Sequence, residues 1–137
     1  MSYSIDDVIV GTGGKQILYN ALFSSINKDD EVIIPAPYWV SYPDMTLLAG
    51  GKPIIVSCSL ETDFKLTAKE LEKFVTKKSK WLILNSPSNP TGACYSRREL
   101  EEIAEVVRRH DNLYVMTDDI YEHIVSVSYT HLRAHET

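Results

Sequence analysis

Several features are scarce in this sequence, and each scarcity excludes a class of protein. The 137 residues contain two cysteines, Cys58 and Cys94, and neither forms a C-x-x-C pair, which excludes a disulfide framework and a cysteine-rich zinc site. Positive charge is also short, with 14 lysines and arginines against 19 acidic residues and a net charge of -5. Because no cluster of lysines and arginines is dense, we expect no nucleic acid partner.

Long hydrophobic runs are missing as well. Runs such as residues 81–84 fall far below the roughly 18 residues that a membrane helix needs, and residues 1–10 lack the basic and apolar regions of a secretory signal. We therefore expect a cytoplasmic protein with no membrane partner. What is present is ordinary, because 44% hydrophobic and 24% charged residues are typical of a globular chain and the length suits one domain.

Short segments rich in Val, Ile and Leu alternate with helical patterns along the chain. The predicted strands are residues 7–10, 31–34, 53–58, 81–85 and 113–117. Continuous apolar runs, rather than alternating apolar and polar residues, are typical of strands that are covered on both faces. The pattern predicts an α/β fold, in which helices lie on both sides of a mostly parallel sheet as a three-layer sandwich with right-handed crossovers.

Helix starts are marked by S/T-x-x-E capping boxes, in which a hydroxyl group and a glutamate satisfy each other's free backbone N–H groups. Thr67 with Glu70 begins one predicted helix, and Ser96 with Glu99 begins another. The other predicted helices span about residues 15–25 and 41–49. Ligands of such sheets bind at the carboxyl ends of the strands, so a functional site is expected in the loops that follow the strands.

A glycine-rich turn, Gly11-Thr12-Gly13-Gly14-Lys15, follows the first predicted strand and precedes a helix. Free backbone N–H groups and the helix dipole would suit a phosphate group there. A tight turn that only connects a strand to a helix explains the glycines equally well. The spacing matches neither G-x-x-x-x-G-K-[ST] nor G-x-G-x-x-G, so neither of these two nucleotide-binding loops is predicted.

The other loops carry single side chains that are suited to binding. Trp39 could stack on a flat ligand, although packing in a core is the commoner use of a tryptophan. Asn89 lies in a turn rich in proline, which would aim its amide or simply lead into the next helix. Asp118 and Tyr121 follow the last strand, where the carboxylate could hold a ring nitrogen or a metal. A metal is disfavoured, because the ligand spacing of zinc and iron sites is absent.

Together these segments resemble the class I, fold type I pyridoxal-phosphate aminotransferases, most closely the bacterial aspartate aminotransferase branch. The resemblance covers about residues 3–125, and its most specific segments are IIPAPYWVSYP at 33–43, NSPSNPTG at 85–92 and DDIYEH at 118–123. It implies a partial large domain of the pyridoxal-phosphate-dependent transferase fold. It also implies a homodimer that binds pyridoxal 5′-phosphate and transfers an amino group between aspartate, or a related amino acid, and a 2-oxo acid.

The resemblance places four residues around the phosphate and one face of the cofactor ring. Backbone N–H groups of Gly13, Gly14 and Lys15 would hold the phosphate at the start of a helix. Trp39 would lie flat against the pyridine ring and would also contribute to the substrate pocket.

The resemblance places three further residues around the edge of the ring. Asn89 would bind the phenolate oxygen of the cofactor and would also face the substrate carboxylate, and Tyr121 would share that phenolate. Asp118 would pair with the pyridine nitrogen and keep it protonated, which lets the ring accept electrons. Asp119 is expected to be solvated or to lie at an interface.

The lysine with which family members form a Schiff base lies in a Ser-Lys segment beyond the Asp-x-x-Tyr motif. No lysine follows Lys80 in this sequence, and the later arginines that would bind the phosphate and the substrate carboxylate are missing too. Without a nucleophile and general base, we expect the chain as given to be inactive and to hold no catalytic residue.

From Val127 onward the sequence stops resembling the family. Residues 127–137 match an in-frame translation of a sequencing-library adapter, and a natural divergent tail is the alternative. We expect residues 1–126 to form a partial cofactor-binding large domain and residues 127–137 to be a non-native tail. The family's sheet places two later strands beside residues 7–10, so we expect that strand to lack neighbours and the chain to be prone to aggregation at an apolar edge.

Two other hypotheses compete with the enzymatic one. The chain could be a non-catalytic α/β module that binds a phosphate ligand at the glycine turn, or it could have no function as given. A phosphate binder has no use for a carboxylate aimed at a ring nitrogen. Convergence of Asn89, Asp118 and Tyr121 on the glycine turn would therefore favour the cofactor, and an Asp118 that faces solvent elsewhere would exclude it.

Overall fold

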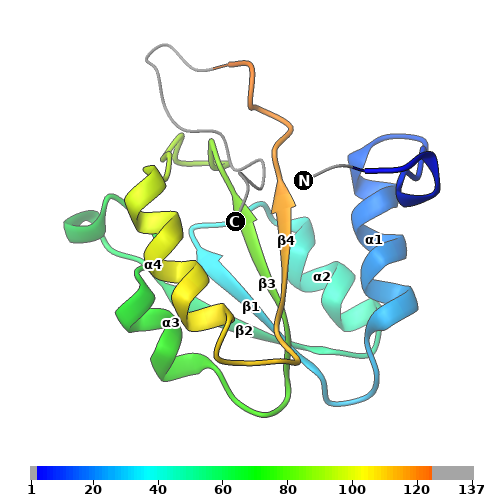
Figure 1. Ribbon diagram of the computed structural model, residues 1–137, viewed down its shortest axis with the longest axis horizontal. Coiled ribbons are helices and arrows are strands. Elements are labelled where there is room, and N and C mark those ends of the chain that lie inside the picture. Colours follow the sequence, from blue (N-terminus) through cyan, green and yellow to red (C-terminus); the bar gives the residue numbers. More distant parts are fainter. Residues whose placement is uncertain (1–2, 125–137) are drawn as a thin grey trace.

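The computed structural model describes residues 3–124, and four parallel strands form its centre (Figure 1). The strands are β1 (Glu31–Ala36), β2 (Lys52–Ser57), β3 (Ser79–Asn85) and β4 (Tyr114–Asp118), in the sheet order β2-β1-β3-β4. The helices are α1 (Gly14–Ser25), α2 (Ser41–Leu48), α3 (Ala68–Phe74) and α4 (Arg97–Val107), with short 3-10 turns η1 (Ile5–Asp7) and η2 (Leu60–Thr62). Four of the five predicted strands and all four predicted helices are confirmed.

The helices cover both faces of the sheet, so the predicted three layers are present. On one face, α3 and α4 pack against the sheet around Ile33, Leu82 and Leu71, which are buried. On the other face, α1 and α2 pack around Leu22 and Ile34. Figure 1 shows the two helix pairs on opposite sides of the strands. Burial on both faces accounts for the unbroken apolar runs of the central strands β1 and β3, whereas the outer strands β2 and β4 each have one buried residue.

The order of the strands reverses its direction between β1 and β3. From β1 the chain passes through α2 to β2 at one side, and then returns through α3 on the opposite face to β3 and onward through α4 to β4. This is the arrangement that right-handed crossovers produce. The carboxyl ends of β1 and β3 are neighbours at the reversal, and ligands of open α/β sheets bind at such a point.

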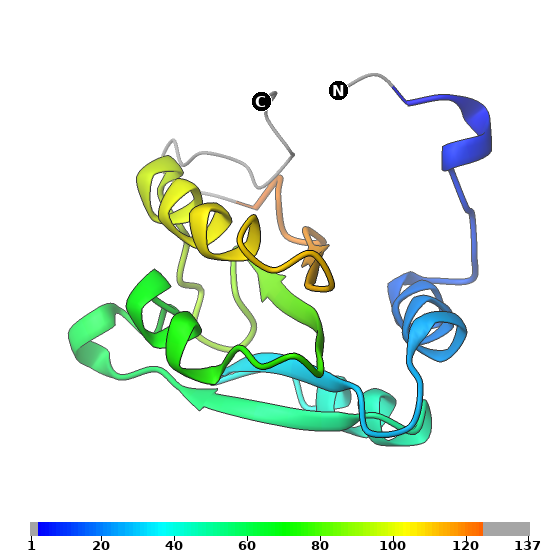
Figure 2. The same cartoon turned by 60° about the horizontal axis from the view of Figure 1, so that its bottom comes forward.

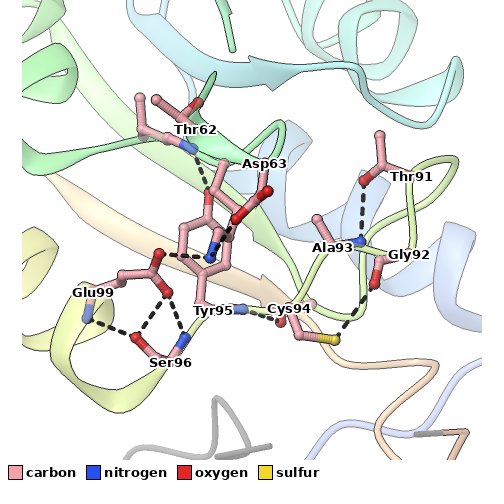
Figure 3. A network of polar contacts seen from close by, with 12 residues as sticks. Thr62, Asp63, Thr91, Gly92, Ala93, Cys94, Tyr95, Ser96 and Glu99 are labelled. Atoms are coloured by element: carbon pink, nitrogen blue, oxygen red, sulfur yellow. Dashed lines mark hydrogen bonds and ion pairs between the residues drawn. The ribbon is translucent and has the colours of Figure 1, made fainter. Parts of the chain in front are cut away.

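The capping boxes differ in how completely they form. At the start of α4, Ser96 accepts from the backbone N–H of Glu99, and Glu99 accepts from the backbone N–H and the hydroxyl of Ser96 (Figure 3). At the start of α3, the Thr67 hydroxyl accepts from the Glu70 N–H, but the Glu70 carboxylate pairs with Lys73 instead of reaching back. Within residues 3–124, none of the helices has the length and the apolar composition to cross a membrane.

The strand predicted at residues 7–10 is wrong. Residues 8–10 form no strand, and the preceding turn η1 ends at Asp7. The side chains of Ile9 and Val10 are 80% and 91% exposed, and Figure 2 shows this segment standing away from the sheet, beyond α1. An extended segment becomes a strand only where a neighbouring strand pairs with its backbone, and within the described residues this segment has no such neighbour.

Candidate functional site

An open cavity of about 630 Å³ lies where the loops after β1, β3 and β4 meet the start of α1. Its lining includes all seven residues that were expected at a cofactor: Gly13, Gly14, Lys15, Trp39, Asn89, Asp118 and Tyr121. These residues are spread over most of the chain, and the reversal of the sheet brings them together. Asn89, Asp118 and Tyr121 thus converge with the glycine turn on one cavity. This is the arrangement expected of a site for a ring, and a turn that binds only a phosphate does not require it.

The glycine turn exposes the start of α1 to this cavity. Gly13 has a φ of 81°, a left-handed backbone that glycine adopts without steric cost, and α1 begins at the next residue. The Gln16 side chain accepts from the Thr12 N–H at 2.6 Å, which holds the turn. A Cβ atom on Gly11 would lie 2.5 Å from the Cδ1 atom of Ile17, so the end of that side chain would have to move. The first N–H groups of a helix lack partners inside it and lie at its positive end, so this part of the cavity suits an anion.

Trp39 forms one wall of the cavity from the loop between β1 and α2. The Lys15 ammonium lies 4.9 Å from the centre of its ring, which is a cation–π contact. The indole also packs nearly perpendicular to the Tyr42 ring, with centroids 5.4 Å apart and planes at 86°. The indole is therefore held on two sides, and a flat ring is the kind of group that such a wall binds.

Asp118 reaches the cavity from the end of β4. Its Oδ2 atom accepts a hydrogen bond from the Tyr42 hydroxyl at 2.7 Å, and its Oδ1 atom has a longer contact of 3.4 Å with the Ile120 N–H. The Asp118 backbone oxygen accepts from the Asn85 amide at 2.7 Å. Asp118 is half-buried, not turned to bulk solvent. The carboxylate is thus anchored through one oxygen while its side chain lines the cavity.

Asn89 is placed by the turn that follows β3. The Asn85 side chain accepts from the Asn89 N–H at 2.7 Å, and the Gly92 N–H donates to the Ser88 oxygen at 2.7 Å. Asn85 thereby ties this turn to the end of β4. The predicted turn is present and closed by these hydrogen bonds, and Asn89 lines the cavity.

Tyr42 and Asn85 were missed as site residues by the sequence interpretation. Both lie inside the segments that resemble the family. Asn85 had a local signal, because one of its partners, the Asn89 N–H, is only four residues away. Tyr42 had one in its spacing from Trp39, because residues three apart at a helix start lie on the same side. The partner of Tyr42, Asp118, is 76 residues away.

Cys58, Cys94 and Asp119 are the other residues considered from the sequence. Burial raises the pKa of the Cys58 thiol and of the Cys94 thiol, so both are poor nucleophiles at neutral pH. Asp119 lines the same cavity and is partly buried. Within residues 3–124, His, Cys, Asp and Glu side chains form no group of three that could hold a metal ion.

Comparisons with known proteins point to one family. The family model described as aminotransferase class I and II matches residues 2–135. A probable aspartate/prephenate aminotransferase of Rickettsia bellii is 60% identical over 124 residues, which cover 90% of this chain and 31% of that protein. The aspartate/prephenate aminotransferase of Cereibacter sphaeroides is 60% identical over 125 residues, which cover 91% of this chain and 31% of that protein.

Solved structures give the same result for the fold. The crystal structure of the aspartate aminotransferase from Rhizobium meliloti superposes with a TM-score of 0.92 at 45% identity, covering 94% of this chain and 32% of that one. The four-stranded parallel sheet with its two helix layers thus matches part of a larger protein. The chain spans 31% of the length of the curated relatives described above.

Proposed function

The chain belongs to the aminotransferase class I and II family, and we propose that it forms the cofactor-binding part of a pyridoxal-phosphate-dependent aminotransferase. The proposed reaction moves an amino group between aspartate, or a related amino acid, and a 2-oxo acid. The relatives are described as aspartate/prephenate aminotransferases, and these descriptions support aspartate or a related amino acid as the substrate.

One observation carries the proposal. An anion-binding helix start, a flat indole and an anchored carboxylate line one cavity of about 630 Å³, a volume typical of small-molecule sites. A phosphorylated, positively charged aromatic ring offers the matching groups: an anion for the helix, a flat face for the indole and an N–H donor for the carboxylate. The residues present therefore fit pyridoxal 5′-phosphate. When bound, this cofactor supplies an electron-withdrawing ring that stabilises negative charge on the reacting carbon.

Each lining residue has a proposed task at the phosphate end or on the ring face. The backbone of Gly13, Gly14 and Lys15 binds the phosphate, for which the positive end of α1 is suited. Trp39 holds the ring face and borders the space for the substrate.

The remaining lining residues have proposed tasks at the ring edge. Asp118 accepts the hydrogen bond of the ring nitrogen, and Tyr121 with Asn89 binds the phenolate oxygen. Asn89 also faces the substrate carboxylate. All of these are binding and orienting tasks.

We further propose that the 137 residues do not catalyse transamination alone. Within the described residues, Lys15 is the lysine that lines the cavity, and it lies at the phosphate-binding end and over Trp39. No lysine follows Lys80, so a nucleophilic amine for the reactive aldehyde is not supplied from the carboxyl-terminal side. The active unit is proposed to be a cytoplasmic homodimer of the full-length parent.

The proposal is tested by comparing two ligands and two variants. Pyridoxamine 5′-phosphate needs no lysine for binding, so titration calorimetry can measure its affinity for the chain beside that of inorganic phosphate. We expect pyridoxamine 5′-phosphate to bind the more tightly, and Asp118→Asn to weaken it by roughly tenfold, about the contribution of one charged hydrogen bond. Phosphate binding should not change in Asp118→Asn.

Asp111→Asn is the matched control, since Asp111 is exposed and does not line the cavity. Equal affinity for both ligands, with no effect of Asp118→Asn, would favour the module that binds only a phosphate. Turnover of aspartate with 2-oxoglutarate by the 137 residues would contradict the proposed inactivity.

A further inference from the structure

Tyr42 is a buried phenol at the floor of the candidate site. It lies in the first turn of α2, its side chain is 2% exposed, and it packs in the core layer between α2 and the sheet. Its backbone N–H donates to the Trp39 oxygen at 3.1 Å, and its backbone oxygen accepts from the Thr46 hydroxyl at 2.9 Å. The position of the ring is therefore set by the helix and not by the loop alone.

The side chain of Tyr42 touches two walls of the cavity at once. Its hydroxyl donates to Asp118 Oδ2 at 2.7 Å, and its ring meets the Trp39 ring edge-on with centroids 5.4 Å apart. One buried side chain, Tyr42, thus connects the core of the protein both to Trp39 and to the Asp118 carboxylate. Tyrosine suits this place because it combines a large apolar body with one polar atom.

The Tyr42 phenol donates a hydrogen bond to the Asp118 carboxylate. Burial, followed by the hydrogen bond and the negative charge of Asp118, raises the pKa of Tyr42 far above its usual value. A phenol that keeps its proton has one O–H group to donate. Asp118 Oδ2 is its acceptor, and this oxygen is engaged before any ligand arrives.

We propose that Tyr42 is a positioning residue for Asp118: it holds Oδ2 and so leaves Oδ1 as the atom that receives the N–H group of a heterocyclic ligand. Oδ1 has the weaker contact, 3.4 Å from the Ile120 N–H, and Asp118 lines the cavity. A carboxylate fixed through one oxygen loses less rotational freedom when the other oxygen binds a ligand. Binding therefore costs less conformational entropy, and the affinity is higher. The inference rests on the proposed function, since it requires a ring nitrogen at Asp118.

A double-mutant cycle on the whole 137-residue chain tests this inference. Titration calorimetry would measure pyridoxamine 5′-phosphate and inorganic phosphate with wild type, Tyr42→Phe, Asp118→Asn and the double variant. We expect Tyr42→Phe to weaken pyridoxamine 5′-phosphate by roughly threefold to tenfold, the usual range for one hydrogen bond, and to leave inorganic phosphate unchanged. In the Asp118→Asn background the same substitution should have no further effect.

Tyr95→Phe is the matched control, because Tyr95 is a buried tyrosine with a hydrogen bond that does not line this cavity. It should bind both ligands like wild type. If Tyr42→Phe weakens both ligands equally, or has the same effect with and without the Asp118 carboxylate, Tyr42 has only a structural role and the inference fails. If wild type does not bind pyridoxamine 5′-phosphate more tightly than phosphate, the proposed function itself fails.

A second measurement does not depend on the folding of the Tyr42→Phe variant. With tyrosine labelled by ¹³C at Cζ, pyridoxamine 5′-phosphate should shift the Tyr42 resonance of wild type, while inorganic phosphate should not. Asp118→Asn should abolish that shift, because the ligand changes the surroundings of the Tyr42 hydroxyl through the Asp118 carboxylate. If pyridoxamine 5′-phosphate does not shift the Tyr42 resonance, or shifts it equally in Asp118→Asn, the inference is overturned.

Discussion

At the scale of single residues, two buried tyrosines use their hydroxyl groups differently, one as a hydrogen-bond donor and the other as an acceptor. The Tyr42 hydroxyl donates to a carboxylate beside the cavity, whereas the Tyr95 hydroxyl accepts from the Leu66 N–H at 2.8 Å, away from the cavity. Burial raises the pKa of both phenols. The first contact lies beside the cavity, and the second joins the segment before α3 to the segment before α4.

Replacing Tyr95 with phenylalanine is expected to reduce stability without altering ligand affinity. The ring remains, but the buried N–H of Leu66 loses its acceptor, which costs about 1–3 kcal/mol of unfolding free energy. Urea denaturation followed by circular dichroism measures this loss. Tyr19→Phe, a change at a tyrosine that packs beside Phe23, is the comparison. A Tyr95→Phe variant as stable as wild type would contradict the role given to this hydrogen bond.

At the scale of elements, the start of α4 is linked to the segment before α3. Lys65 lies 2.6 Å from Glu99 Oε1, and Ser96 donates to Glu99 Oε2 from its backbone N–H and its hydroxyl. Figure 3 shows this network around Glu99 and Tyr95. Burial alone would raise the pKa of Glu99, but the hydrogen bonds from Lys65 and Ser96 outweigh it, so the pKa is lowered from 4.5.

The lowered pKa predicts how stability changes with pH. A carboxyl group whose folded pKa lies below its unfolded value stabilises the fold at pH values above the unfolded pKa, and this contribution is lost as the pH falls through the folded pKa. Glu99→Gln should therefore lower the urea midpoint at pH 7, and its difference from wild type should shrink below about pH 4.5.

Glu101→Gln provides the comparison on the same helix, because Glu101 forms an exposed pair with Arg97, and exposed pairs contribute little. Its midpoint should stay close to that of wild type at both pH values. A Glu99→Gln difference that is constant from pH 7 to pH 3 would contradict the link to this carboxyl group.

At the scale of the whole molecule, apolar surface is left uncovered on one side. Ile9 and Val10 are 80% and 91% exposed, and Tyr114 on the end strand β4 is 51% exposed. Within the described residues no strand pairs with the outer edge of β4. An unpaired strand edge next to apolar side chains promotes association between chains.

The chain is therefore expected to self-associate as its concentration rises, and Ile9→Lys with Val10→Lys should reduce this. Both side chains are largely exposed, so the urea midpoint should not change. Sedimentation velocity over a concentration series measures the association. Leu60→Lys, at an apolar residue that is 72% exposed in η2, is the control. Equal association of wild type and the double lysine variant would show that the segment at 8–10 is not responsible.

Local signals in the sequence determined most of the elements. The apolar runs predicted β1 to β4, although burial on both faces explains such runs only for the central strands β1 and β3. The Ser96 and Glu99 pattern predicted the start of α4 because that cap is made by neighbours in sequence. The chemical character of the loops, including the glycine turn and Asp118, was also visible. The seven expected site residues came from the resemblance to the aminotransferases, and all seven line one cavity of the folded chain.

Only the tertiary structure decided which of these segments meet. The reversal between β1 and β3 brings Trp39 beside Asn89, and the Tyr42 hydroxyl meets Asp118 across 76 residues of chain. The same dependence on distant partners explains the wrong strand at residues 7–10, which had the composition of a strand but has no described neighbour to pair with. Composition is a property of a segment, whereas hydrogen-bond pairing and proximity are properties of the folded chain.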